Sequence, residues 1–319
     1  MNLSIIIPTF NNVDFLDELF TSILKNKTSI QYEVLVGIDG CELTKNFLTN
    51  QKYPNNFQFF YFTKNDGPYK IKNTLSELSK YDKLFFFDSD DVMVENCIDR
   101  ISDYLIKCDC IKPKFENFKD NKGIRDFDKR KGQYGEGVFG IDKRLFLAMN
   151  GFEGWKCAAD SDFMGRLYKT GKKVLVSKEV LFYRRLHNNS LTKRKDTGYA
   201  SSLRAEYFGL SKKRVNFGPL PTLSKNDYQE LDIETYEWSK PISTIENENL
   251  DKLKQIKKKK QELLNLLFNK QPREIKPKVK QTIDYSTVNN RTNHQTNSNL
   301  NQALKKAKLE NLKKNFGRR

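Results

Sequence analysis

The chain has 319 residues, and its 37% hydrophobic and 12% aromatic content suits one substantial folded domain with additional segments. No apolar run approaches the roughly 20 residues of a membrane-spanning helix, and the opening MNLSIIIPTF is too short in apolar residues for a secretory signal, which predicts a cytoplasmic protein. The formal net charge is +17, and about +12 of it belongs to residues 241–319, so most of the charge lies in a tail.

The first third of the chain alternates short apolar runs with amphipathic segments. Strands are predicted at residues 3–7, 32–40, 57–63 and 83–90, and helices at 14–26, 69–80 and 94–107. Strands that alternate with helices of about 10 to 15 residues predict βαβ units with right-handed crossovers. The expected fold class is therefore α/β, with a mostly parallel central sheet flanked by helices.

The alternation breaks after residue 110. Residues 111–136 are polar and strongly charged, which predicts a loop and an edge strand. Further elements are predicted as a short strand, a helix and a Gly turn over 138–152, a helix over 160–169 ended by Gly171 and followed by a strand, and a last strand with a polar loop over 180–192. Residues 216–245 contain several prolines and predict an extended wrap or linker.

Residues 246–319 predict a basic tail that is helical in part and of low complexity in part. Its lysine-rich, amphipathic stretches suit peripheral contact with an anionic membrane surface. A solvated, partly disordered extension or an oligomerisation segment is the alternative. Nucleic-acid binding is unlikely, because the tail has few aromatic residues for base stacking. The oligomeric state stays open.

The five cysteines indicate neither disulfides nor a zinc site. Their number is odd, no two of them form a CxxC pair, and the chain has only two histidines. The cysteines are Cys41, Cys97, Cys108, Cys110 and Cys157. Reduced thiols are the expectation for such a chain.

Three carboxylates follow a buried strand in the stretch LFFFDSDDVM, namely Asp88, Asp90 and Asp91. Like charges so close raise one another's pKa unless a cation lies among them. One acid would suffice to cap the helix that follows. Three acids within four residues favour instead a site for Mg²⁺ or Mn²⁺, which prefer carboxylate and phosphate oxygens.

Polar residues also follow the other predicted strands. Residues 9–12, Asp39, residues 65–67 and residues 88–91 each come directly after a strand. Ligands of parallel α/β sheets collect at the carboxyl ends of the strands, so these residues are expected along one rim. Acids, amides and a Gly turn there suit a nucleotide with a divalent ion.

The same motifs carry a resemblance to a known family. LSIIIPTFNN, EVLVGIDG, KNDGPYKIKN, LFFFDSDD, GFEGWKCAADSDFMGRLYKTG and FYRRLHNNSLT resemble, in this order, the motifs of family 2 glycosyltransferases with the GT-A fold. The likeness covers about residues 1–195. It implies a GT-A domain over 1–215, with a nucleotide-binding half at 1–110 and an acceptor half at 111–215.

The resemblance implies an inverting enzyme that uses a nucleotide sugar, expected to be a UDP-sugar, and a role for particular residues. Nucleotide contacts are implied for Pro8, Thr9, Asp39, Asn65, Gly67, Lys72, Asn73 and Asp88. The metal ligands would be Asp90 and His187. Contacts with the acceptor or the diphosphate are implied for Trp155, Arg184 and Arg185. Lys72 stands where the family carries arginine. The lysine keeps the positive charge but lacks the planar guanidinium group that can donate two parallel hydrogen bonds.

The general base is expected at Asp160, at the start of a predicted helix. The family usually has an acid directly before the base, and here that position is Ala159, while Asp162 follows two residues later. Asp162 is therefore the alternative base. The base would take the proton of an acceptor hydroxyl on a glycan, a lipid-linked glycan or a protein.

Two other function classes remain open from the residues. One is a nucleotidyltransferase of related fold, although PTFNN stands where a Gly- and Lys/Arg-rich loop would be expected. The other is a non-catalytic protein that binds nucleotides or anionic surfaces.

Overall fold

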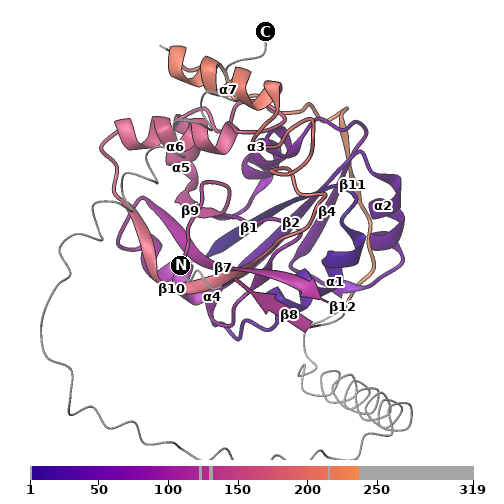
Figure 1. Ribbon diagram of the computed structural model, residues 1–319. Coiled ribbons are helices and arrows are strands. Elements are labelled where there is room, and N and C mark those ends of the chain that lie inside the picture. The colour runs from indigo at the N-terminus through magenta and orange to yellow at the C-terminus, as the bar shows by residue number, and fades with distance from the viewer. Residues whose placement is uncertain (1, 122–123, 129–131, 215, 237–319) are drawn as a thin grey trace, which may run out of the picture. The chain divides into compact units, whose positions relative to one another are not determined.

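The computed structural model describes residues 2–121, 124–128, 132–214 and 216–236 (Figure 1). The chain divides into two compact units, Met1–Thr244 and Ile245–Arg319, and every described residue belongs to the first. The tail predicted over 246–319, with its proposed membrane or oligomer contacts, lies outside the described residues. Among the described residues, no helix is both long enough and apolar enough to cross a bilayer.

In the described residues the main sheet has ten strands. Nine of them follow the order β11-β4-β2-β1-β5-β9-β7-β10-β6, and the tenth, β8, pairs with β7. The strands are β1 (Leu3–Thr9), β2 (Tyr32–Asp39), β4 (Phe57–Phe62), β5 (Lys83–Phe86), β6 (Val92–Met93), β7 (Cys110–Asn121), β8 (Ile124–Phe127), β9 (Phe139–Asp142), β10 (Val174–Arg185) and β11 (Tyr228–Leu231). A separate pair consists of β3 (Tyr53–Pro54) and β12 (Thr235–Tyr236). The helices are α1 (Val13–Leu24), α2 (Glu42–Thr49), α3 (Pro68–Leu78), α4 (Cys97–Leu105), α5 (Lys143–Ala148), α6 (Ala159–Lys169) and α7 (Ser202–Lys213).

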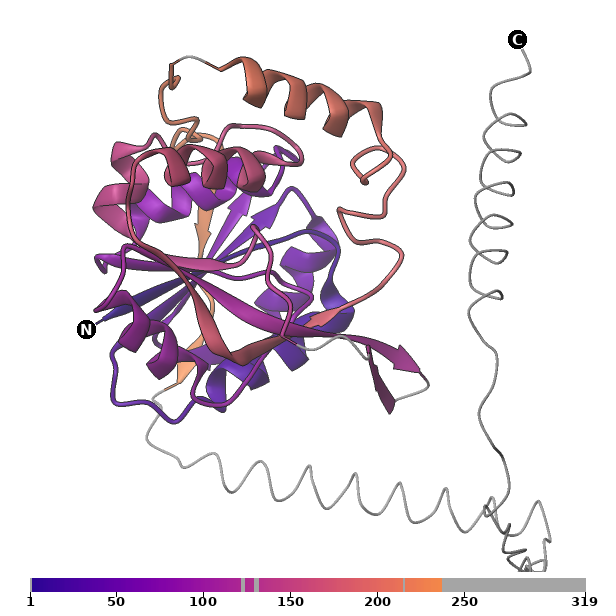
Figure 2. The same cartoon turned by 60° about the vertical axis from the view of Figure 1, so that its left-hand side comes forward.

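Helices cover both faces of the sheet because alternate side chains of each strand point to opposite faces. Ile5 and Ile7 of β1 belong to one buried cluster with residues of α1 and α4. Ile6 belongs to a second cluster with residues of α3, α5 and α6. Figure 2 shows the helices on the two sides of the sheet. Each large side chain buried in these clusters stabilises the fold by about 1.5–3 kcal/mol.

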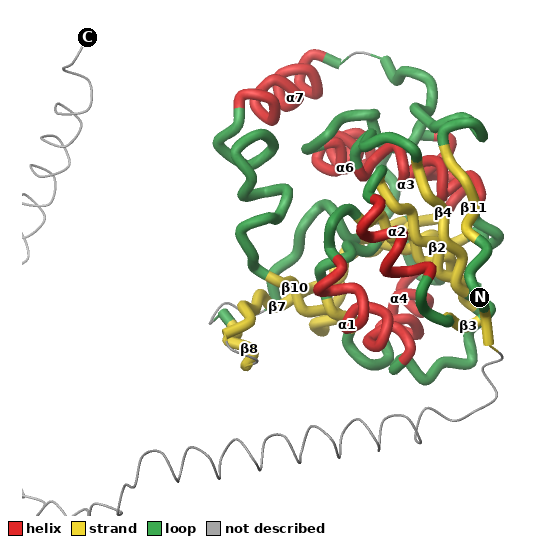
Figure 3. The backbone as a smooth tube through the Cα atoms, turned by 90° about the vertical axis from the view of Figure 1, so that its right-hand side faces the viewer, coloured by secondary structure: helices red, strands yellow, loops and turns green. Residues whose placement is uncertain are grey.

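The predicted α/β class is confirmed. β1 pairs in parallel with β2 and β5, and β2 pairs in parallel with β4, as the alternation of strands and helices predicted. Antiparallel pairs are added by β9 on β5, β11 on β4 and β6 on β10. α7 lies outside α6, on the side away from the sheet (Figure 3).

The expectation of a loop and an edge strand over 111–136 was wrong in one respect. β7 is a 12-residue strand inside the sheet, between β9 and β10. The strand can be polar and still lie inside the sheet, because its buried polar side chains have partners. Lys112 pairs with Glu136, and Asn117 accepts a hydrogen bond from Arg184. The short helix α2 was not predicted.

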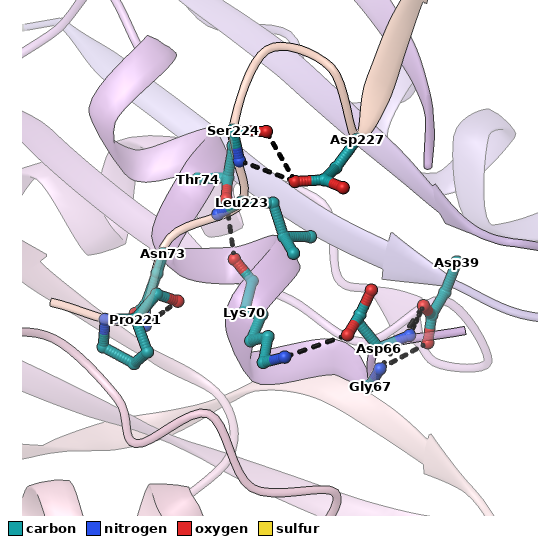
Figure 4. A network of polar contacts seen from close by, with 10 residues as sticks. All are labelled: Asp39, Asp66, Gly67, Lys70, Asn73, Thr74, Pro221, Leu223, Ser224 and Asp227. Carbon is teal, nitrogen blue, oxygen red and sulfur yellow. Dashed lines mark hydrogen bonds and ion pairs between the residues drawn. The ribbon is translucent and has the colours of Figure 1, made fainter. Parts of the chain in front are cut away.

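Residues 216–236 return to the sheet as an extended segment. β11 pairs with β4 and forms one edge of the sheet. Before that, Leu223 N donates to Thr74 Oγ1 at 3.0 Å, and the Asn73 amide donates to Pro221 O at 3.4 Å, so the segment is attached to α3 (Figure 4). The described part of the predicted wrap therefore packs on the domain that carries the rim.

Candidate active site

Three adjacent parallel strands end at one edge of the sheet. β1 ends at Thr9 and β2 at Asp39, and β5 leads into Asp88 two residues after its end. Thr9 is buried, and its hydroxyl has no hydrogen-bond partner among the described residues. Pro8 is buried beside it and lies opposite Gly37 of β2. This edge is the rim that the sequence predicted.

Asp39 holds the turn that begins α3. Its carboxylate accepts hydrogen bonds from Asp66 N at 2.8 Å and from Gly67 N at 3.1 Å (Figure 4). Asn65 donates to the backbone oxygen of Asp39 at 3.3 Å. Gly67 has a φ of 90°, which a side chain rarely tolerates, and its Cβ position lies 3.4 Å from Lys156 Cα. Burial raises the pKa of the Asp39 carboxyl to about 6, although the two backbone donors oppose this effect.

We expect Asp39 to make the stability of the domain fall as the pH rises from about 4 to 6. Its pKa in the folded state, about 6, lies above the ordinary pKa of an aspartate, so the folded state binds the proton more tightly than the unfolded state does. The protonated carboxyl contributes its full stabilisation below about pH 4, and this contribution is lost as the pH rises through 6. The free energy of unfolding should therefore fall by about 3 kcal/mol over this range. Urea unfolding between pH 4.5 and 7 measures it: Asp39→Asn should gain stability relative to wild type as the pH rises. A constant difference between the two proteins would contradict the assignment.

The acidic turn after β5 brings the two predicted metal ligands together. Asp90 Oδ2 lies 2.7 Å from His187 Nε2, although the residues are 97 positions apart. Asp91, in contrast, is buried and accepts a hydrogen bond from Arg185 N at 2.9 Å, which joins the turn to the end of β10. Burial, and then the negative charges of Asp90 and Asp88, raise the pKa of Asp91 well above its usual range.

The assignment of Asp90 and His187 as ligands of a divalent ion stays a prediction, because in this structure the two side chains contact each other directly. Both side chains keep some exposure, 20% for Asp90 and 16% for His187. The described part of the chain contains no group of three or more His, Cys, Asp or Glu side chains arranged around one point. Mg²⁺ is commonly held by one or two carboxylates plus substrate phosphates and water. Asp90 supplies one such carboxylate.

Two further carboxylates flank Gly137. The Cβ position of Gly137 lies 3.3 Å from Asp160 Oδ2 and 3.7 Å from Asp88 Oδ2, so any side chain there would contact both acids. The buried Lys72 ammonium lies 3.1 Å from Asp88 Oδ1 and donates to Gly137 O at 3.3 Å. Asp88 and Asp160, from different halves of the sequence, are thereby neighbours, with Lys72 offsetting part of their charge.

Asp160 and Asp162, the two candidate bases, have different surroundings. Asp160 is partly exposed, and Tyr69 donates a hydrogen bond from its hydroxyl to Asp160 Oδ1 at 2.9 Å. Asp162 is buried and accepts a hydrogen bond from Arg166 Nε at 2.8 Å. Arg166 also donates to the carbonyl oxygens of Met149 and Gly151. Asp160 therefore borders the rim, whereas Asp162 belongs to the packing beneath α6.

Asp162→Ala should destabilise the domain by about 3–5 kcal/mol, because it leaves the buried Arg166 guanidinium without its carboxylate. Asp160→Ala should cost much less stability, since the Asp160 side chain is partly exposed. Urea unfolding of both variants against wild type measures the difference. Equal losses of stability in the two variants would contradict the assignment of Asp162 to the buried packing and of Asp160 to the rim.

Two of the predicted contact residues are buried and have several protein partners. Asn73 is buried, and its amide both donates to Phe152 O at 2.8 Å and accepts from Phe152 N at 2.9 Å. Arg185 is buried, pairs with Glu18 and Asp120, and donates to Asp90 O at 2.9 Å. For these two residues a direct ligand contact stays a prediction.

The aromatic and cationic residues predicted for the acceptor or diphosphate are also engaged. Trp155 stacks on Tyr207 of α7 with 4.8 Å between ring centroids. Arg184 donates to Asn117 at 2.8 Å and lies over the ring of Phe115. Ligand contacts of Trp155 and Arg184 stay predictions. Conversely, Tyr69 and Gly137 were not predicted as site residues, because a tyrosine in a first helical turn and a glycine in a loop are ordinary features.

Residues 4–163, which include the rim of the sheet and Asp160, match the model of the family described as Glycosyl transferase family 2. That match covers half of the chain, and the chain belongs to this family. The expected membership and GT-A fold are confirmed.

Relatives match over part of the chain. Poly(ribitol-phosphate) beta-N-acetylglucosaminyltransferase TarP of Staphylococcus aureus is 34% identical over 106 residues, 32% of each protein. Chondroitin synthase of Pasteurella multocida is 35% identical over 94 residues, which are 28% of this chain and 10% of the synthase. A crystal structure of S. aureus TarS 1-349 with UDP-GlcNAc has a TM-score of 0.48 and 16% identity, covering 60% of each chain. The chain thus spans about a third of TarP and a tenth of the synthase.

Proposed function

We propose that this protein transfers a sugar from a UDP-sugar to a hydroxyl of a glycan acceptor, with inversion at the anomeric carbon and with Mn²⁺ or Mg²⁺ as cofactor. The observation that carries the proposal is the meeting of Asp88 and Asp160 at Gly137, on the edge that also holds the Asp90–His187 pair. Family membership supplies the reaction class. It also argues against the nucleotidyltransferase alternative.

The donor side of the proposal concerns the nucleotide. Thr9 has a buried hydroxyl that is without a partner among the described residues, and Asp39 lies at the end of the adjacent strand. Both suit polar contacts with a base, and Asp88 suits a ribose hydroxyl. N-acetylglucosamine is the first sugar to test, because the relative TarP is named as an N-acetylglucosaminyltransferase.

The acceptor side of the proposal concerns Asp160. Its carboxylate takes the proton from the acceptor hydroxyl while that oxygen attacks the anomeric carbon and the bond to the diphosphate breaks. Tyr69 holds one oxygen of this carboxylate and leaves the other, Oδ2, toward Gly137. Asp90 and His187 would hold the divalent ion, which when bound offsets the charge of the departing diphosphate. The acceptor is proposed to be a glycan. A lipid-linked glycan is a narrower option, and a protein hydroxyl is the alternative acceptor.

Release of UDP from UDP-GlcNAc tests the proposed function. The full chain is incubated with Mn²⁺ and with UDP-GlcNAc, UDP-glucose, GDP-mannose or a dTDP-sugar, with and without a mixture of soluble glycans. The proposal predicts release from a UDP-sugar that depends on the metal and rises with an acceptor. Binding of UDP without any turnover would favour the non-catalytic alternative. Release from the GDP- or dTDP-sugar alone would contradict the choice of UDP.

A further inference from the structure

A group of polar and aromatic side chains lies beside the candidate site and has no part in the proposed reaction. It consists of Lys112 on β7, Tyr134 and Glu136 in the segment before β9, and Tyr168 on α6. We call these four residues the Lys112 cluster. Its centre is the Lys112 ammonium, whose side chain is only 3% exposed.

The contacts of Lys112 fix two aromatic rings around a neutral centre. Its Nζ lies 2.8 Å from Glu136 Oε1 and 2.9 Å from the Tyr168 hydroxyl. The same nitrogen lies 4.8 Å from the ring centroid of Tyr134 and 5.7 Å from that of Tyr168. The Glu136 carboxylate offsets the charge of the ammonium. The cluster therefore holds its rings in place without offering net charge to a ligand.

Both rings are nevertheless exposed to solvent. Tyr134 is 56% exposed and Tyr168 is 51% exposed, so neither side chain is explained by burial in the core. Aromatic rings combined with a few fixed polar groups are typical of sites for small polar ligands with an apolar face.

The cluster and the candidate site share two segments of the chain. Glu136 directly precedes Gly137, whose Cβ position is 3.3 Å from Asp160 Oδ2. Tyr168 follows Asp160 on the same helix, α6, and eight residues at 1.5 Å each place it about 12 Å further along the axis. An oligosaccharide is long enough to extend from one place to the other, whereas a single sugar is not.

We propose that the Lys112 cluster is a subsite for a neutral sugar ring of the acceptor glycan, remote from the hydroxyl that receives the new sugar. The sugar ring stacks on the exposed ring of Tyr134 or Tyr168. This rests on the proposed function, since it takes the acceptor to be a glycan.

A microarray of defined neutral and anionic glycans tests the subsite without need of turnover. The full chain is applied as wild type, Tyr134→Ala, Tyr168→Ala and Tyr168→Phe, with Tyr236→Ala as the control at an exposed tyrosine of β12. We expect wild type to bind neutral oligosaccharides better than monosaccharides. The alanine variants at 134 and 168 should bind at least tenfold more weakly, while Tyr168→Phe, which keeps the ring, and Tyr236→Ala should bind like wild type.

Unchanged binding by both alanine variants, binding to anionic glycans only, or no binding to any glycan would overturn the subsite. Release of UDP from UDP-GlcNAc without an acceptor separates this failure from failure of the proposed function. If that release persists while glycan binding ignores the two tyrosines, only the subsite is wrong. If no UDP is released and no UDP binds while glycan binding depends on the tyrosines, the proposed reaction is wrong and the subsite stands.

Discussion

Asp160→Asn should lower the rate of sugar transfer about 10²–10⁴-fold, the usual contribution of a general base. The asparagine keeps the shape of the side chain and can still accept the hydrogen bond from Tyr69, but it cannot take a proton at neutral pH. The affinity for UDP should change little, because Asp160 is proposed to act on the acceptor. Steady-state transfer rates and calorimetric UDP titrations, run on the same preparations, measure the two effects separately.

Asp82→Asn is the matched control for this change. Asp82 precedes β5, at the opposite end of the strand from Asp88, and its side chain is 68% exposed. The same loss of one carboxylate there should leave transfer at the wild-type rate. Retention of full activity by Asp160→Asn, together with inactivity of a folded Asp162→Asn, would move the base to Asp162.

Asp90→Asn should remove most of the effect of Mn²⁺ on UDP binding. In wild type, we expect Mn²⁺ to tighten UDP binding at least tenfold, or about 1.4 kcal/mol. The variant loses the carboxylate that lies 2.7 Å from His187, so UDP should bind with nearly the same affinity with and without the metal. Titrations of UDP with Mn²⁺ and with a chelator give both affinities.

His187→Gln provides the companion test, because it removes the second expected ligand and leaves Asp90 in place. It should also reduce the Mn²⁺ effect, whereas Asp82→Asn should not. A full Mn²⁺ effect in both Asp90→Asn and His187→Gln would exclude this pair as the metal site and return the acidic turn to a structural role.

The sequence predicted the parts of the fold that rest on apolar patterning. The strands β1, β2, β4 and β5 are continuous apolar runs, and their order along the chain implies a parallel sheet whose ends form one rim. β7 was not predicted as an interior strand, because its buried Lys112 and Asn117 are compensated by residues far away in the sequence. A local sequence pattern cannot predict partners that are this distant in the chain.

The candidate site was predictable to the extent that its residues follow strands or form a compact motif. Asp88, Asp90 and His187 lie at strand ends, and the topology alone brings them to one edge. The inward positions of Asn73 and Arg185 depend on tertiary partners, Phe152 for the first and Glu18 for the second. The same holds for Tyr69, whose hydrogen bond to Asp160 joins residues 91 positions apart.

The central claim is that this edge of the sheet binds a UDP-sugar together with a divalent ion. Calorimetric titration of the full chain with UDP, GDP, CDP and dTDP, each with Mn²⁺ and with a chelator, tests it most directly. The account predicts binding of UDP in preference to the other three, and tighter binding with Mn²⁺ than without it. Binding of none of the four nucleotides, or equal binding of all four irrespective of the metal, would contradict it.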